Sequence, residues 1–185
     1  MKNLALIAVL LAGAVALPQP AQAETVMITA ARMLDVATGK LIERPAIMVQ
    51  DGRITQVGRQ GELPAAATAD KRIDLGDLTI LPGLIDMHVH LTSDPTLSGL
   101  QRLRYPPAFW TAIGTAMARR TIDAGFTTVR NVGSADFADV GLKMAIERGA
   151  IAGPRIVPAT YSIGATGGHC DANALPANYR FDRPG

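Results

Sequence analysis

The sequence is poor in residues that cross-link, stack or carry excess charge. It has one cysteine, and aromatic residues make up 4% of it. A single thiol cannot form an internal disulfide, so a packed core has to hold the fold. The formal net charge is +2, and with so few aromatic rings neither a nucleic-acid surface nor an anionic membrane surface is indicated. The composition favours a globular protein that acts on a small-molecule substrate.

The single cysteine, Cys170, directly follows His169, which raises the question of a nucleophilic dyad. Side chains of adjacent residues in an extended chain point to opposite sides, and such dyads normally form between residues that are distant in sequence. We therefore do not expect Cys170 to be catalytic.

Residues 1–23 have the three parts of a secretory signal peptide. Lys2 provides a basic start, residues 4–17 form an apolar run, and residues 21–23 (AQA) match the small-x-small pattern of a cleavage site. The apolar run is too short to span a bilayer comfortably. We expect cleavage after Ala23 and export to the periplasm or the medium, with no membrane partner for the mature chain.

Residues 24–82 are expected to form a small antiparallel β module. Strand-like runs at 46–50 and 53–57 flank Asp51 and Gly52, and Asp-Gly is a preferred two-residue hairpin turn. Further strand-like segments lie at 25–33, 72–75 and 78–81. A module of this size is too small to bury both faces of a sheet unaided.

From residue 83 onward, strands and helices alternate. Strands are predicted at 84–91, 126–132 and 154–160, and helices at about 106–124 and 136–148. Pro106 and Pro107 open the first helix, and Asp136 is expected to cap the second. Short connections between these elements predict parallel βαβ units with right-handed crossovers, a fold of the α/β class.

Two histidines stand at the end of the first of these strands. Residues 81–91 read LPGLIDMHVHL, which predicts a buried strand ending in His88 and His90. Side chains at i and i+2 leave a strand on the same face, so both imidazoles can reach one point. Neutral imidazole is the commonest protein ligand for zinc and related metals, which indicates a divalent metal site. The alternative is one hydrogen-bonded core histidine and one solvated histidine.

Other polar residues follow the later strands. Arg130 and Asn131 stand near the end of the second strand, and His169 lies in the loop after the third. In parallel folds the chemistry gathers at the carboxyl ends of the strands. This convergence favours the metal-ligand interpretation of His88 and His90. An arginine at a strand end more often pairs with a neighbouring carboxylate, so Arg130 is not expected in the site.

Four segments resemble the amidohydrolase superfamily, specifically its imidazolonepropionase-like and Xaa-Pro or Xaa-Arg dipeptidase-like branch. They are 81–91 (LPGLIDMHVHL), 124–132 (AGFTTVRNV), 153–157 (GPRIV) and 166–169 (TGGH). The resemblance implies an N-terminal β-sandwich segment at 24–82. It also implies that residues 83–185 form the first three strands of an incomplete (β/α)8 TIM barrel of a metal-dependent hydrolase.

The activity implied by the resemblance is hydrolysis of an amide or peptide-like C–N bond in a small substrate. His88 and His90 would hold the first of one or two divalent ions, zinc being favoured. Such a metal lowers the pKa of a bound water toward neutrality and polarises the scissile carbonyl. The family pattern places a bridging lysine, two histidines and an aspartate acting as general base after later strands. We expect no catalytic general base before Gly185, and interpret the chain as the front part of a longer product.

Two further residues are each open to two interpretations, and a third departs from the family pattern. Asp86 could orient a ligand imidazole from the same strand face, or it could bond to the local backbone. The resemblance implies a substrate contact for His169, whereas a loop histidine is solvent-exposed by default. At position 131 the family usually has aspartate, so a role that requires charge there is not expected of Asn131.

Two functions therefore remain open. The first is an exported metal-dependent amidohydrolase. The second is a truncated, non-catalytic fragment that binds metal or a partner chain. Two histidines leave a zinc ion short of its usual three or four protein ligands, so the second function predicts weak metal binding.

Overall fold

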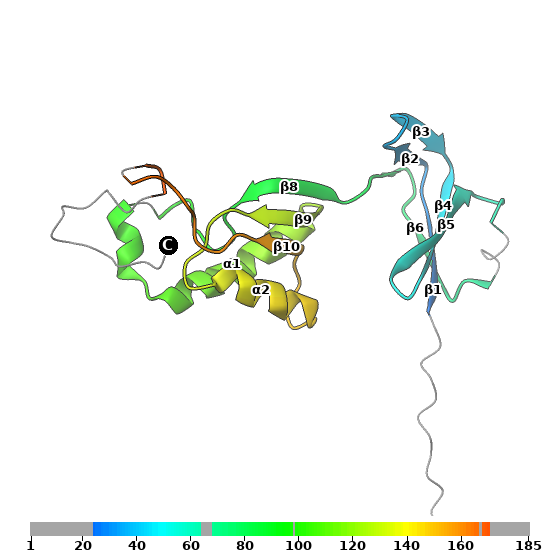
Figure 1. Cartoon of the computed structure of the whole chain (residues 1–185). Helices are drawn as coiled ribbons and strands as arrows, with labels where there is room; N and C mark the ends of the chain where they lie inside the picture. The colour runs from blue at the N-terminus through cyan, green and yellow to red at the C-terminus, as the bar shows by residue number, and fades with distance from the viewer. Residues whose placement is uncertain (1–23, 64–67, 98, 167, 171–185) are drawn as a thin grey trace, which may run out of the picture. The chain divides into compact units, whose positions relative to one another are not determined.

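The computed structural model describes residues 24–63, 68–97, 99–166 and 168–170. The chain divides into two compact units, one ending at Leu81 and the other beginning at Pro82 (Figure 1). The expected signal peptide at 1–23 lies outside the described residues. No helix in the described part of the chain is long and apolar enough to cross a membrane.

The described residues of the first unit form two β-sheets, with strand orders β5-β4-β1-β6 and β3-β2-β7. The strands are β1 (Thr25–Thr29), β2 (Arg32–Asp35), β3 (Lys40–Glu43), β4 (Pro45–Gln50), β5 (Arg53–Arg59), β6 (Lys71–Asp74) and β7 (Thr79–Ile80). β1 pairs antiparallel with β4, but it pairs parallel with β6, and β2 pairs parallel with β7. The expectation of a purely antiparallel module is therefore wrong. β6 and β7 are far along the chain from their partners, so no tight turn forces them into antiparallel pairing.

The hairpin between β4 and β5 confirms the turn prediction. Asp51 and Gly52 have φ values of 51° and 71°, the left-handed conformations that a type I′ turn requires. Gln50 pairs with Arg53 directly across this turn. Glycine reaches this conformation without a Cβ clash, and aspartate tolerates it, which explains why these two residues stand here.

The described residues of the second unit form a parallel sheet with two α-helices along one face (Figure 1). Its strands lie in the order β10-β9-β8, and both neighbouring pairs are parallel. The elements are β8 (Leu84–Val89), η2 (a 3-10 helix, Gly99–Arg104), α1 (Pro107–Asp123), β9 (Phe126–Asn131), α2 (Ala138–Glu147) and β10 (Arg155–Pro158). Strands and helices alternate as the sequence predicts.

The core of the second unit lies between the sheet and the helices. Val129 of β9 and Ile156 of β10 pack with Leu91 and with Leu142 of α2, and each of the four is at most 4% exposed. Gly114 lets α1 approach α2 closely, since a Cβ on it would lie 2.5 Å from Leu142 Cδ1. This core holds the carboxyl ends of the three strands in fixed relative positions.

Two local expectations for this unit are wrong. β8 is not buried, because it is an edge strand among the described residues and its Ile85 and Met87 are 61% and 67% exposed. Asp136 does not cap α2. The N-cap is Phe137, in a left-handed conformation with no side-chain cap, while the Asp136 carboxylate accepts a hydrogen bond from the Tyr161 hydroxyl instead.

Candidate functional site

His88 and His90 lie together at the carboxyl end of β8. His88 is within the strand and His90 directly follows it. Their ring centroids are 5.6 Å apart, with an interplanar angle of 74°. Both residues are exposed. The structure thus brings the two imidazoles side by side and leaves them accessible to a ligand.

The ring of His90 packs against the loop that follows β9. Its Nδ1 lies 3.4 Å from the carbonyl oxygen of Gly133. A carbonyl can only accept, so this contact favours a proton on Nδ1, and the tautomer of the neutral ring with that proton has its lone pair on Nε2. Gly133 has no room for a side chain, since a Cβ would lie 3.3 Å from His90 Nδ1 and 2.8 Å from Ser162 Oγ.

Behind His90, a buried polar network joins the ends of the three strands. The Asn131 Oδ1 accepts from the Leu91 N–H at 2.8 Å, and its Nδ2 donates to Asp139 Oδ2 at 3.1 Å. The same Asp139 oxygen accepts from the Thr160 N–H at 3.0 Å. Two side chains therefore tie together the segments that follow β8, β9 and β10.

The loops around this network contain non-glycine residues in left-handed conformations. Asp136, Phe137 and Thr160 have φ values of 52°, 54° and 63°, each of which costs about 1–2 kcal/mol. Hydrogen bonds hold two of them, from the Thr160 N–H to Asp139 and from the Asp136 N–H to the Tyr161 hydroxyl. Such strained backbone persists where surrounding contacts fix it, and it is common beside functional sites.

Asp86 makes a local backbone contact. Its Oδ1 accepts from the N–H of His88 at 2.9 Å, which is the second of the two interpretations offered for it. This bond fixes the main chain of β8 at His88. A role for Asp86 in orienting an imidazole stays a prediction.

His169 and Cys170 are exposed residues of the loop that follows β10. Cys170 lies over Gly164, where a Cβ would come within 2.8 Å of the Cys170 Cβ. A substrate contact for His169 stays a prediction, as does the absence of a catalytic role for Cys170.

The donors at the strand end fit part of a metal site. Within the ranges that the structure describes, no group of three or more histidine, cysteine, aspartate or glutamate residues is placed to hold a metal ion. His88 and His90 offer two imidazole nitrogens, the donor type that zinc accepts, but a complete zinc site has three or four protein ligands. The two imidazoles are therefore suitable donors for a divalent metal, but two donors make an incomplete ligand set.

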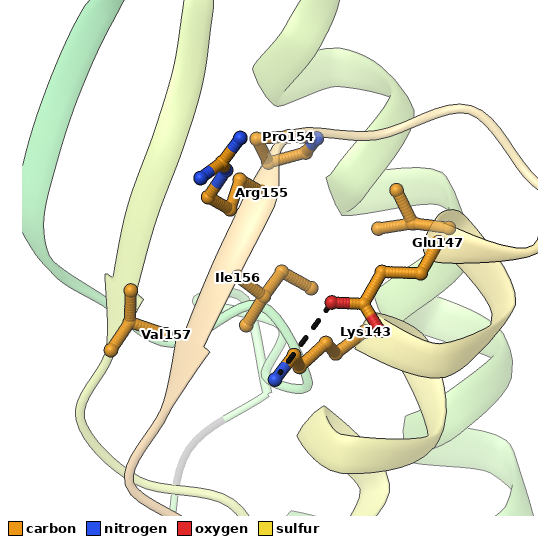
Figure 2. A pocket seen from close by; sticks show the side chains of 7 residues that line it. Lys143, Glu147, Pro154, Arg155, Ile156 and Val157 are labelled. Atoms are coloured by element: carbon orange, nitrogen blue, oxygen red, sulfur yellow. Dashed lines mark ion pairs between the residues drawn. The ribbon is translucent and has the colours of Figure 1, made fainter.

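A hollow of about 610 Å³ lies between α2 and β10 (Figure 2). It is lined by Lys143, Ile146, Glu147, Pro154, Arg155, Ile156 and Val157, and by none of the predicted site residues. The Lys143 and Glu147 side chains form an ion pair of 3.8 Å beside it. β10 is the outermost strand of the sheet in the described part of the chain, so this hollow is an open side of the fold rather than a cleft around the histidines.

Sequence reasoning missed the buried pair beside His90. Asn131 was placed near the end of its strand and noted as a departure from the family's usual aspartate, but no partner was predicted for it, and Asp139 was not considered. The available signal was an acidic residue in the predicted first turn of a helix, where a carboxylate is stabilised by free backbone N–H groups. The structure shows that bond, with Asp139 Oδ1 accepting from the Val140 N–H at 3.0 Å.

The described residues of the second unit form a parallel α/β arrangement with polar side chains at the carboxyl ends of its strands, the edge at which folds of this class typically bind their ligands. The sequence pattern of the Amidohydrolase family matches residues 79–184, which is more than half of the chain. The chain belongs to this family.

Known relatives agree with this assignment. The chain is 45% identical over 51 residues to the imidazolonepropionase of Brucella suis, a match to 28% of this chain and 13% of that protein. It is 43% identical over 53 residues to a 5-methylthioadenosine/S-adenosylhomocysteine deaminase of Moorella thermoacetica, covering 29% of this chain and 12% of that protein.

A solved structure is similar over most of the chain. A Xaa-Pro dipeptidase with methionine bound in its active site matches with a TM-score of 0.72 and 30% identity, covering 87% of this chain and 39% of that one. The present chain therefore spans well under half the length of the proteins it matches.

Proposed function

We propose that this chain is part of an exported, metal-dependent amidohydrolase that hydrolyses an amide or peptide-like C–N bond in a small substrate. The observation that carries the proposal is the pair of accessible imidazoles, 5.6 Å apart, at the carboxyl end of a parallel strand. Family membership and the hydrolytic relatives support the reaction class.

The second unit is proposed to be the first three strands of a (β/α)8 barrel. Its parallel strands follow one another in chain order across the sheet, with helices on one face. A complete barrel takes about 250 residues and eight strands, and the similar dipeptidase is more than twice as long as the part matched here. The two sheets of the first unit would form the β-sandwich segment.

His88 and His90 are proposed to supply two ligands of a divalent metal, with zinc favoured by the imidazole donors. When bound, such a metal supplies an activated water and polarises the scissile carbonyl. The Gly133 carbonyl, 3.4 Å from His90 Nδ1, would accept a hydrogen bond from a proton on that nitrogen and leave the Nε2 lone pair for the metal. Asp86 holds the backbone at His88. His169 is proposed to contact substrate, and the remaining ligands and the general base belong to later strands.

A hydrolysis assay tests this proposal. The gene product that carries this chain, loaded with zinc, is assayed against dipeptides and cyclic ureides, next to its His88→Asn/His90→Asn variant. We expect zinc-dependent release of products that the double variant lacks. Activity that survives both the double substitution and removal of zinc would overturn the proposal. A chain that binds zinc but cleaves none of these substrates, with the remaining strands present, would favour the non-catalytic binding module instead.

A further inference from the structure

Asn131 and Asp139 form a buried polar pair in the second unit. Both are 0% exposed, and Asp139 is a carboxyl group to which the structure gives no cationic partner among the described residues. Burying such a group is costly unless hydrogen bonds compensate it. Asp139 accepts three, from Asn131 Nδ2 and from the N–H groups of Thr160 and Val140. Asp139 is thereby linked through Asn131 to Leu91 and Gly133, the residues that flank and contact His90.

We propose that Asn131 and Asp139 are positioning residues that fix the orientation and the tautomer of His90, so that its Nε2 faces the metal. The inference rests on the proposed metal role of His90. Neither side chain touches that metal in this scheme. Asn131 acts through the Leu91 N–H and the Gly133 carbonyl, and Asp139 acts through Asn131.

Asn131 holds His90 from two directions. Its Oδ1 accepts from the N–H of Leu91, the residue that follows His90, at 2.8 Å. Its Nδ2 donates at 3.2 Å to the Gly133 oxygen, the atom that lies 3.4 Å from His90 Nδ1. A carbonyl oxygen has two lone pairs and can serve both donors. One amide thereby fixes the main chain beside His90 and the acceptor that holds its ring proton.

Asp139 determines which way the Asn131 amide points. A carboxylate only accepts, so the NH₂ group of Asn131 has to face Asp139, which turns the amide oxygen toward the Leu91 N–H. An aspartate at 131 would place an oxygen against both the Gly133 carbonyl and the Asp139 carboxylate. This explains why an amide rather than a second carboxylate occupies position 131 in this chain.

The tautomer of His90 is the most direct test. The full chain has three histidines, so long-range ¹H–¹⁵N spectra of the metal-free protein at about pH 8, above the ordinary imidazole pKa, can distinguish their rings. We expect His90 to carry its proton on Nδ1. Asn131→Asp and Asp139→Asn should each shift His90 toward the Nε2–H form. A wild-type His90 protonated on Nε2 would overturn the proposal without any variant.

Val129→Ala is the matched control for lost stability. Val129 is fully buried two residues before Asn131 in β9 and packs in the core with Leu142 and Ile156. Its truncation lowers stability without removing a side-chain hydrogen bond, so the His90 tautomer should not change. If Asn131→Asp and Asp139→Asn lose stability to the same extent as Val129→Ala and leave the tautomer unchanged, the pair is only structural and the proposal fails.

Zinc affinity separates this inference from the proposed function. Loss of a group that orients a ligand typically weakens metal binding by about 10- to 100-fold, and we expect this for both variants but not for Val129→Ala. A wild-type chain with the Nδ1–H tautomer that binds no zinc would support the positioning of His90 and contradict the metal site. Equal zinc affinity in wild type and both variants would contradict the positioning role.

Discussion

Gly83 and Thr127 lie so close together that a Cβ on Gly83 would come within 2.2 Å of both Thr127 Oγ1 and Cγ2. Gly83 stands directly before β8, and the Leu84 N–H bonds to the Gly125 carbonyl at 2.9 Å. The amino ends of β8 and β9 can therefore approach this closely because residue 83 has no side chain. This relationship gives a physical reason for the glycine in the Pro-Gly step before the histidine-bearing strand.

Gly83→Ala should destabilise the second unit by about 1–3 kcal/mol, the usual cost of overpacking. The change in the free energy of unfolding is measured by chemical denaturation. Gly141→Ala is the matched control, because Gly141 lies in α2 with nothing within 4 Å of the added Cβ, and it should raise stability by about 0.5–1 kcal/mol. Thr127→Ala should recover part of the loss in Gly83→Ala. A neutral Gly83→Ala would contradict the close approach of the strands.

Asp139→Ala should lower the free energy of unfolding by about 3 kcal/mol, because buried donors that lose their acceptor each cost about 1–3 kcal/mol. Asp123→Ala provides the comparison at the surface. Asp123 pairs with Arg119 at 2.7 Å, yet both side chains are more than half exposed, so its loss should cost less than about 1 kcal/mol. If urea unfolding gives the same loss of free energy for both substitutions, the three hydrogen bonds to the buried Asp139 carboxylate do not stabilise the fold as described.

The loop after His90 should lose stability in acid, when the Asp94 carboxylate becomes protonated. The hydroxyl and the N–H of Thr96 donate to the Asp94 carboxylate at 2.6 and 2.8 Å and hold its pKa below the ordinary value. Because the folded-state pKa is lowered, the stabilisation is present above the ordinary aspartate pKa and is lost as the pH falls through the lowered value. Titration of the Asp94 carboxyl carbon by NMR should show this shift, and Thr96→Val should remove most of it. An unshifted Asp94 in the wild type would contradict the two hydrogen bonds.

The sequence carries enough local information to predict the strand–helix alternation and the Asp51-Gly52 hairpin. Both depend on short-range rules, namely periodicity, helix-opening prolines and the left-handed conformations of an Asp-Gly turn. The closeness of His88 and His90 also follows from strand geometry alone. These features need no knowledge of what packs against them.

Features that depend on distant partners could not be predicted in this way. The parallel pairing of β6 with β1 joins segments about 45 residues apart, and no local pattern specifies its direction. Asp136 and Asp139 are both plausible acidic residues for the start of α2. Their different roles depend on the loop after β10. The Tyr161 hydroxyl of this loop donates to the exposed Asp136 carboxylate, and the Thr160 N–H donates to the buried Asp139 carboxylate.

Zinc titration of the full chain against a chromophoric chelator tests most directly whether His88 and His90 are metal ligands. We expect about one zinc ion per chain, bound more weakly than in a complete site of three or four ligands. His88→Ala and His90→Ala should each abolish this binding, whereas His169→Ala should retain it. Zinc affinity that is unchanged in the His88→Ala/His90→Ala double variant would show that these two histidines are not metal ligands.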